Sequence, residues 1–422
     1  MLKEGKHKFS KGWIKGECYC MIDINDKAKC CGCAACEAVC PKHCISMQSD
    51  EEGFLYPYVE KKSCIHCDMC DRACPITNKI EKVSFVQKGY LIRHKDKEIR
   101  LDSTSGGAFT AFAETIIDRG GYVVGAALDE QLKVKHIVVG TKKNLGRFRN
   151  SKYVQSNLQG IYSSVKKLLD DNKIVCFSGT PCQIEGLRSY LKKDYKSLYC
   201  IDTVCRAVPS PGAFEKYKEY QENTFNDELV GVRFRDKYYG YSYSTLNVKL
   251  RTKDSKYHRG IESDPWLRAF FSEMCDRPSC HQCVFRSQYR CSDITMWDCF
   301  NVHDFFQKWD DGTGVTRILV HTAKGQELLD ESKKYAETVD VSVNELVKDV
   351  KEMVDSPIPN KRRSEFMRDL EMMDGKALFD KYFPIRDKNN FKHLMRVFLA
   401  KTGIYNNVKY GLRKVKKKGK NK

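Results

Sequence analysis

Residues 30–41 read Cys30-Cys-Gly-Cys33-Ala-Ala-Cys36-Glu-Ala-Val-Cys40-Pro41. Residues 64–75 repeat the pattern as Cys64-Ile-His-Cys67-Asp-Met-Cys70-Asp-Arg-Ala-Cys74-Pro75. Both stretches have the spacing C-x2-C-x2-C-x3-C-P, and both lie in a cysteine-rich segment that ends near residue 84. The same unit occurring twice indicates an internal duplication.

This spacing is typical of ferredoxins that bind two 4Fe-4S clusters, in which the fourth cysteine of each run binds the cluster of the other run. We therefore expect Cys30, Cys33, Cys36 and Cys74 to bind one cluster. We expect Cys64, Cys67, Cys70 and Cys40 to bind the second. Structural zinc is the alternative, because paired C-x2-C units also form zinc sites. Zinc requires neither the third cysteine, nor the proline, nor the duplication, so the pattern favours iron. Four cysteines of this segment fall outside the pattern and are interpreted as small buried hydrophobic residues. They are Cys18, Cys20, Cys31 and Cys44.

The chain has 422 residues, enough for two or three domains, and 41% of them are hydrophobic. Of its 21 cysteines, 12 lie between Cys18 and Cys74 and nine between Cys176 and Cys299. The polar N-terminus does not resemble a secretion signal, so we expect a reducing compartment. No apolar stretch approaches the roughly 18 residues that span a bilayer. These features predict a soluble, cytoplasmic protein.

From residue 85 to about residue 205, patterns typical of strands and helices alternate. We expect strands at 88–94, 122–128, 134–139, 174–177 and 198–204, and helices at 108–118, 158–169 and 182–192. Two further strands are expected within residues 230–250, and a short helix at 265–274. Beyond about residue 320 the chain is expected to be helical and charged. This order predicts an α+β or α/β fold.

A second group of cysteines comprises Cys182, Cys205, Cys280, Cys283, Cys291 and Cys299. Cys182 and Cys205 follow predicted strands, and strand ends at one edge of an open α/β sheet are where sites form. Spacing alone does not establish that these cysteines converge.

In this region the sequence resembles the beta subunits of coenzyme F420-reducing hydrogenases and dehydrogenases, in the bacterial type with a fused two-cluster ferredoxin domain. The resembling stretches are Ser-Thr-Ser-Gly-Gly-Ala-Phe-Thr-Ala (103–111), Ser-Lys-Tyr-Val-Gln-Ser (151–156), Phe-Ser-Gly-Thr-Pro-Cys-Gln-Ile-Glu-Gly-Leu (177–187), Val-Cys-Arg-Ala-Val-Pro-Ser (204–210), Cys-His-Gln-Cys (280–283), Ser-Asp-Ile-Thr (292–295) and 314–329. One departure is Met296-Trp297-Asp298-Cys299, where relatives usually have Leu-Gly-Asp.

The resemblance implies a flavin such as FAD and a third 4Fe-4S cluster. Carried onto this sequence, the cluster ligands are Cys182, Cys205, Cys280 and Cys283. Cys291 or Cys299 could replace one of them. A zinc site of the same four thiolates, or buried thiols without a metal, are the alternatives.

Two stretches are candidates for flavin contact. Ser105, Gly106 and Gly107 open a predicted helix, and amide groups at a helix N-terminus favour an anion such as a flavin pyrophosphate. An ordinary capped helix is the alternative. Gly179 and Thr180 turn from a strand into a helix in the same way. The chain has no G-x-G-x-x-G fingerprint and no phosphate-binding loop of the G-x-x-x-x-G-K-[ST] type, so a nicotinamide Rossmann site and nucleotide hydrolysis are unsupported.

The net charge of +19 is concentrated at the C-terminus, where residues 386–422 alone contribute +12. Residues 391–415 alternate apolar side chains with Lys and Arg. This basic amphipathic pattern suits an anionic membrane surface, and a solvated lysine tail on a docked helix is the alternative. The chain contains no known nucleic-acid module, so no nucleic acid is expected as a partner.

Together these features predict three parts: a two-cluster ferredoxin-type domain (1–84), a larger α/β flavin and iron–sulfur domain (85–345) and a helical, basic C-terminal region (346–422). The leading hypothesis is an iron–sulfur flavoprotein oxidoreductase that transfers electrons between a low-potential one-electron donor, such as a ferredoxin or a partner reductase, and a small two-electron organic acceptor. A non-catalytic electron-transfer subunit is the second hypothesis, and a cluster-containing sensor or scaffold the third. The catalytic residues are not assigned.

Overall fold

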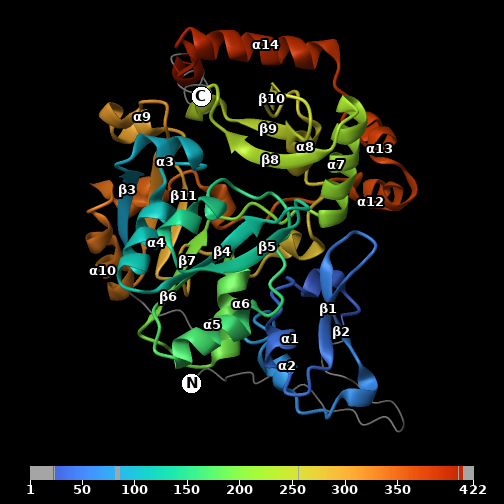
Figure 1. Ribbon diagram of the computed structural model, residues 1–422, viewed down its shortest axis with the longest axis vertical. Helices are drawn as coiled ribbons and strands as arrows, with labels where there is room; N and C mark the ends of the chain where they lie inside the picture. The colour runs from blue at the N-terminus through green and yellow to red at the C-terminus, as the bar shows by residue number, and fades with distance from the viewer. Residues whose placement is uncertain (1–21, 23, 81–85, 255, 407, 412–422) are drawn as a thin grey trace, which may run out of the picture.

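The computed structural model describes residues 22, 24–80, 86–254, 256–406 and 408–411. Cys18, Cys20 and residues 412–422 lie outside the described residues. Figure 1 shows a small N-terminal domain at one end, a large central sheet flanked by helices, and a second small sheet covered by the C-terminal helices at the other end. The predicted multidomain α/β fold is therefore confirmed.

The N-terminal domain contains the two cysteine runs and one hairpin. Its elements are η1 (Lys27–Lys29), α1 (Ala35–Val39), β1 (Ile45–Ser49), β2 (Leu55–Val59), η2 (Lys61–Ser63) and α2 (Met69–Arg72). The duplication is visible in the backbone. Gly32 and Ala34 of the first run take φ values of 69° and 62°, and the equivalent His66 and Asp68 take 52° and 59°. In both runs, the two equivalent residues therefore take the left-handed backbone conformation just before a short helix begins.

The central sheet has eight strands in the order β13-β3-β12-β11-β7-β6-β4-β5. Their bounds are β3 (Lys88–His94), β4 (Tyr122–Leu128), β5 (Val134–Val139), β6 (Val175–Gly179), β7 (Leu198–Thr203), β11 (Ile294–Asp298), β12 (Thr316–Val320) and β13 (Ala336–Val341). β4, β6, β7 and β11 are mutually parallel, and β3 runs in the same direction because both β3 and β11 are antiparallel to β12. Their carboxyl ends therefore meet at one edge.

Alternating side chains of these strands bury both faces of the sheet. Val123 and Cys176 pack in one core with α4 (Ala108–Asp118) and α10 (Ala323–Ser332). Val124 and Val175 point the other way, into a core with α5 (Ile161–Asp170) and α6 (Pro181–Leu191). Ala35 and Val39 of the N-terminal domain join this second core. The cysteine domain is thus packed directly against the α5/α6 face.

A second sheet, of order β10-β9-β8, lies beyond the carboxyl edge of the first. Its strands are β8 (Leu229–Asp236), β9 (Thr245–Leu250) and β10 (His258–Arg259). The helices that accompany it are α7 (Pro211–Phe225), α8 (Pro265–Phe270), α12 (Arg363–Met372), α13 (Gly375–Tyr382) and α14 (Asp387–Lys401). Phe214 of α7, Trp266 of α8 and Phe379 of α13 pack together in one core. Shorter elements complete the chain: α3 (Lys97–Asp102), η3 (Lys142–Phe148), η4 (Tyr241–Tyr243), η5 (Pro278–Gln282), α9 (Val302–Phe305), η6 (Gln307–Trp309), α11 (Val343–Val347) and η7 (Lys351–Met353).

The strands predicted at 88–94, 122–128 and 134–139 and the helix at 108–118 have the predicted bounds. The prediction that the chain is helical beyond residue 320 is wrong in one place, because β13 forms an edge strand paired with β3. The first part of the basic amphipathic stretch is helical as far as Lys401, and Gly403 follows with a φ of 73°; among the described residues beyond it, 405–406 and 408–411 are helical again. Among the described residues, no helix is long and apolar enough to cross a membrane.

Candidate metal centres and cofactor site

The first cysteine set lines one pocket of the N-terminal domain. Cys30, Cys33 and Cys36 of the first run surround it together with Cys74 of the second. Its apolar walls are Ile22, Ile24, Met47, Pro57 and Ile76. The empty space measures about 340 Å³, including the part that is open to solvent. The structure thus brings together the four cysteines that the spacing groups.

A second pocket, of about 440 Å³ including its open part, is lined by Cys64, Cys67 and Cys70 with Cys40 of the first run. Cys44 lies here too, with its Sγ 3.4 Å from that of Cys40. The fourth cysteine is therefore exchanged between the two runs in both pockets.

The pKa values of these thiols indicate whether the pockets suit a metal. Burial raises the pKa of the Cys36 thiol, and the thiols of Cys30 and Cys74 raise it further. Metal coordination requires thiolates, and several thiolates held in an apolar pocket need a cation beside them. Among the described residues, no group of three or more His, Cys, Asp or Glu side chains is arranged around a single metal ion. In a cubane, the four thiolates bind four separate iron corners. The donor sets fit iron–sulfur clusters.

The third cysteine group forms at the carboxyl edge of the central sheet. Cys182 lies in the first turn of α6, and Cys205 follows the adjacent parallel strand β7. Burial raises the pKa of Cys205 to about 12, and the next causes are the thiols of Cys182 and Cys283. Burial raises the pKa of Cys280 as well, with Cys205 as the next cause. The four cysteines predicted for a third cluster are thus neighbours.

Cys291 and Cys299 lie elsewhere. Cys291 is near Glu185 and Arg188 and packs against the α5/α6 core. Cys299 is buried near Arg317 in a different apolar cluster. The geometry therefore favours the four cysteines named first over either substitute.

Cys31 connects the first pocket with the third group. It lines the first pocket, and its thiol interacts with those of both Cys33 and Cys182. Its sequence context alone suggests a small buried hydrophobic residue. The structure adds that it lies between two candidate clusters.

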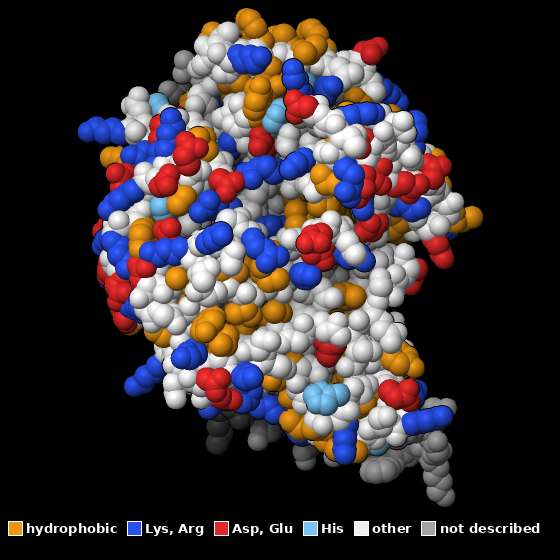
Figure 2. All heavy atoms as spheres, viewed as in Figure 1, with side chains coloured by type: hydrophobic (Ala, Val, Ile, Leu, Met, Phe, Trp, Pro, Cys, Tyr) orange, Lys and Arg blue, Asp and Glu red, His pale blue; other side chains and the backbone are white. Residues whose placement is uncertain are grey.

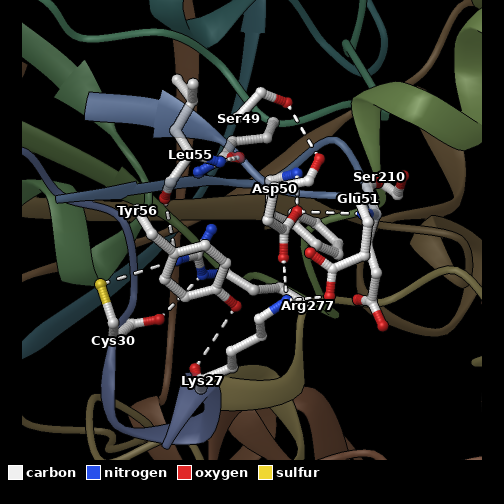
Figure 3. Close-up of polar contacts among 12 residues, drawn as sticks. Lys27, Cys30, Ser49, Asp50, Glu51, Leu55, Tyr56, Ser210 and Arg277 are labelled. Carbon is white, nitrogen blue, oxygen red and sulfur yellow. Dashed lines mark hydrogen bonds and ion pairs between the residues drawn. The ribbon is translucent and has the colours of Figure 1, made fainter. Parts of the chain in front are cut away.

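Arg277 is a fully buried residue at the same junction, and no sequence motif points to it. Its Nε donates to the carbonyl oxygen of Cys30 at 2.8 Å, and its Nη2 donates to that of Leu55 at 3.0 Å (Figure 3). Nη2 also lies 3.6 Å from Cys30 Sγ, and the guanidinium stacks 4.0 Å from the ring centroid of Tyr56. Nη1 has no hydrogen-bond partner among the described residues. A positive charge is therefore held against a candidate cluster ligand.

The predicted flavin segment at residues 103–107 is packed onto the sheet. Ser105 Oγ donates to the carbonyl oxygen of Val315 at 2.6 Å, and the Gly106 amide donates to Thr316 Oγ1 at 2.9 Å. A Cβ on Gly106 would lie 2.6 Å from the carbonyl oxygen of Ile92. The absence of a side chain at Gly106 thus allows its backbone to lie close to strands β3 and β12. Gly107 takes a φ of 79° as the N-cap of α4.

Gly106→Ala is expected to lower the free energy of unfolding by about 1–3 kcal/mol, because the added methyl group collides with strand backbone. Thermal unfolding measures the change. Gly146→Ala is the control, since no atom lies within 4 Å of its added Cβ. Equal stability of the two variants would show that Gly106 is not packed as described.

The other predicted flavin segment, Gly179 and Thr180, joins β6 to α6. The Thr180 amide donates to Gln183 Oε1 at 2.9 Å, which forms a capping box. Thr180 Oγ1 lies 3.1 Å from Cys182 Sγ. This segment therefore adjoins the third cysteine group.

Basic side chains gather beside Ser105 at the same sheet edge. They are Arg149, Lys152, Arg233, Arg235 and Lys237, and their acidic partners are Asp102, Asp236 and Asp298. Lys237 Nζ donates to the carbonyl oxygens of Arg100, Ser105 and Thr313, each at 2.6 Å. Figure 2 shows Lys and Arg side chains around a hollow in this face.

The basic residues outnumber the acidic residues in this group, and the pKa values of two of its lysines are lowered. Burial and then the charge of Arg233 lower the pKa of Lys152 to about 7. Burial lowers the pKa of Lys237 to about 7 as well. Arg235 Nη2 lacks a hydrogen-bond partner within the part of the chain that the structure describes. The arrangement fits a bound anion, whose charge would offset the mutual repulsion of the cations. The sequence could not reveal this group, because residues 149–152 and 233–237 meet only in the fold.

Two family models match the chain. Residues 29–78 match the 4Fe-4S dicluster domain, and residues 172–343 match the C terminus of the coenzyme F420 hydrogenase/dehydrogenase beta subunit. One component of the F420H2 dehydrogenase of Methanosarcina mazei is 22% identical over 170 residues, which are 38% of this chain and 47% of that protein. An uncharacterized ferredoxin of Methanocaldococcus jannaschii is 42% identical over 57 residues, which are 14% of this chain and 71% of the ferredoxin.

One component of an NADH-quinone oxidoreductase of Geobacter metallireducens is 37% identical over 57 residues, covering 12% of this chain and 44% of that component. The chain thus spans less than half of two of these curated relatives. Among solved structures, a chain of the F420-reducing [NiFe] hydrogenase complex from Methanosarcina barkeri aligns with a TM-score of 0.42 and 16% identity, over 71% of this chain and 91% of that one.

The matched regions contain the duplicated cysteine runs and the third cysteine group. These matches indicate an iron–sulfur protein related to oxidoreductase subunits. The predicted resemblance is thus confirmed at the level of domains: residues 29–78 belong to the 4Fe-4S dicluster domains, and residues 172–343 to the C-terminal domains of coenzyme F420 hydrogenase/dehydrogenase beta subunits.

Proposed function

We propose that this protein is an iron–sulfur flavoprotein oxidoreductase that transfers electrons between a low-potential one-electron donor and a small two-electron organic acceptor. The observation that carries the proposal is the continuity of the candidate sites. Cys31 interacts with Cys33 of the first pocket and with Cys182 of the third group. The third group in turn adjoins the sheet edge where the basic residues gather.

The proposed cluster ligands form three sets. They are Cys30, Cys33, Cys36 and Cys74; Cys40, Cys64, Cys67 and Cys70; and Cys182, Cys205, Cys280 and Cys283. When bound, the clusters exchange single electrons and a flavin exchanges electron pairs as hydride. None of the 19 cysteines that the structure describes is paired in a disulfide, in keeping with the proposed reducing compartment such as the cytoplasm.

The flavin, FAD or a relative of it, is proposed to bind at the carboxyl edge of the central sheet, near Ser105 to Gly107 and Gly179 to Thr180. Half-buried Lys152 supports this position, because a pyrophosphate would restore the charge that burial disfavours in it. Tyr241 also contributes to this edge. Its hydroxyl lies 3.4 Å from Ser105 Oγ and donates to Asp298 at 3.0 Å.

Acid extraction of the anaerobically purified protein tests the proposal. About one flavin per chain is expected. Lys152→Ala is expected to weaken flavin binding by about 10- to 100-fold, because a hydrogen bond to a charged group contributes about 1.5–3 kcal/mol. Exposed Lys166, paired with Asp170 on α5, provides the control variant Lys166→Ala, which should keep its flavin.

The same site predicts a dependence of flavin affinity on pH. Free Lys152 has a pKa near 7, and a bound phosphate would raise that pKa toward the ordinary value. Binding above pH 7 therefore takes up a proton, and the dissociation constant should increase by up to about tenfold per pH unit. Below pH 7 the lysine is already charged, so the affinity should stay constant.

A protein that contains iron but no flavin would overturn the enzyme proposal. That result would favour the second function, a non-catalytic subunit that delivers electrons to a partner enzyme. If the wild type and Lys152→Ala contained the same amount of flavin, the proposed flavin site at this edge of the sheet would be wrong.

A further inference from the structure

Helix α14 contacts the rest of the protein through its polar face. Asn389 Nδ2 donates to the carbonyl oxygen of Glu262 at 2.9 Å, and Arg396 Nη1 pairs with the carboxylate of Glu262 at 2.6 Å. His393, which is buried, forms a hydrogen bond with Tyr243 at 2.7 Å. A helix on a globular protein ordinarily turns its apolar stripe inward, so this arrangement is inverted.

The apolar face of α14 is turned to the outside. Phe391, Leu394, Met395 and Phe398 are 64%, 63%, 44% and 60% exposed. Their spacing of i, i+3, i+4 and i+7 places them on one face. Figure 1 shows α14 along the edge of the molecule, over the second sheet, and Figure 2 shows hydrophobic side chains gathered on the same edge. Contiguous apolar surface of this kind marks an interaction site.

Lysines border this stripe. At about 100° per residue, Lys388 and Lys392 fall on one side of it and Lys401 on the other, and all three are exposed. Lysines in this position can extend their stems along an apolar surface and keep their ammonium groups in a polar layer. The chain from residue 386 onward carries a net charge of +12.

We propose that the outward face of α14 binds an anionic membrane surface. The apolar stripe enters the boundary between headgroups and acyl chains, and the lysines on both sides meet the lipid phosphates. A second copy of the chain is a poorer occupant, because it would bring two strongly basic segments together.

The position of α14 gives this contact a consequence for electron transfer. In Figure 1, α14 and the N-terminal cysteine domain lie at opposite ends of the molecule. A protein held on a membrane by α14 therefore keeps the domain with the two ferredoxin-type pockets at the end away from the lipid, on the side of a soluble donor. The proposal concerns attachment only and does not depend on the flavin.

Co-sedimentation of the full-length protein with vesicles tests the proposal. Binding to phosphatidylcholine vesicles that contain phosphatidylglycerol is expected to be at least tenfold stronger than to phosphatidylcholine alone. Binding should weaken when salt is raised from 0.1 to 1 M, because the screening length falls from about 10 Å to about 3 Å.

The double variant Leu394→Asp with Phe398→Asp is expected to lose at least tenfold in vesicle affinity. Both side chains are exposed, so iron content and thermal unfolding should stay at wild-type values. Ile358→Asp changes an equally apolar residue that is 84% exposed outside this helix, and it should bind as the wild type does.

Two outcomes would overturn the proposal. One is equal binding by the wild type and the double variant, or equal binding to neutral and anionic vesicles. The other is a dimer in sedimentation velocity that the double variant converts to a monomer, which would assign the face to a second copy of the chain.

Discussion

Cys182→Ser is expected to lower the iron content from about twelve to about eight atoms per chain, since each 4Fe-4S cluster contains four. Cys182 lies in the first turn of α6, beside the candidate ligands Cys205 and Cys283 and in contact with Cys31. Loss of this ligand removes the site between the ferredoxin-type domain and the basic sheet edge. Transfer of electrons to the acceptor should fall by more than the roughly 10–100-fold that loss of a residue hydrogen-bonded to a metal ligand typically causes.

The two ferredoxin-type clusters of the Cys182→Ser protein should still be reduced by dithionite, which separates loss of one cluster from loss of the fold. Cys291→Ser is the control, because Cys291 lies near Glu185 and Arg188 and not with the third group. Metal analysis and single-turnover reduction measure both effects. Twelve iron atoms in Cys182→Ser, or eight in Cys291→Ser, would show that the third cluster is misplaced.

The second large effect is expected at Arg277. Arg277→Gln should lower the reduction potential of the cluster bound by Cys30, Cys33, Cys36 and Cys74. A reduced cluster carries one more negative charge, and a buried guanidinium with its Nη2 3.6 Å from Cys30 Sγ stabilises it. Two unit charges 4 Å apart interact by about 4 kcal/mol at an effective dielectric constant of 20, so the change should be several tens of millivolts and at most about 170 mV.

Redox titration followed by electron paramagnetic resonance measures this potential. Arg277→Lys keeps the charge and should shift the potential less than Arg277→Gln does. It also provides a second variant in case loss of the hydrogen bonds to Cys30 and Leu55 impairs folding of Arg277→Gln. Arg317→Gln is the control, since Arg317 is a buried arginine whose neighbours are Asn301 and Leu346. If the Arg277→Gln protein had its full iron content and unchanged reduction potentials, Arg277 would not stabilise the reduced cluster as described.

The parts of the structure predicted most closely from sequence are those determined by local chemistry. The C-x2-C-x2-C-x3-C-P spacing is enough to predict which cysteines share a pocket, because each run has to wrap one cluster. The strands β3, β4 and β5 are likewise readable, since their apolar residues form a continuous or alternating pattern. Cys182 and Cys205 are candidates because they follow strands, and the parallel pairing of β6 with β7 brings them together.

Other features depend on contacts that the sequence does not display. β13 mixes Glu337, Thr338 and Asp340 with apolar residues because it is a half-exposed edge strand, so its sequence resembles that of a charged helix. Helix α7 is not among the predicted helices, although Ser210 caps it and Pro211 opens it, which are common start signals. Arg277 belongs to no motif, and its role follows only from the packing of the N-terminal domain against residues 277–283.

The most direct test is the metal content of the freshly purified protein, kept free of oxygen throughout. We expect a brown protein with about twelve iron and twelve sulfide per chain, in which the eight cysteines of the duplicated runs hold two of the three clusters. A colourless protein that contains zinc, or no metal, would contradict it.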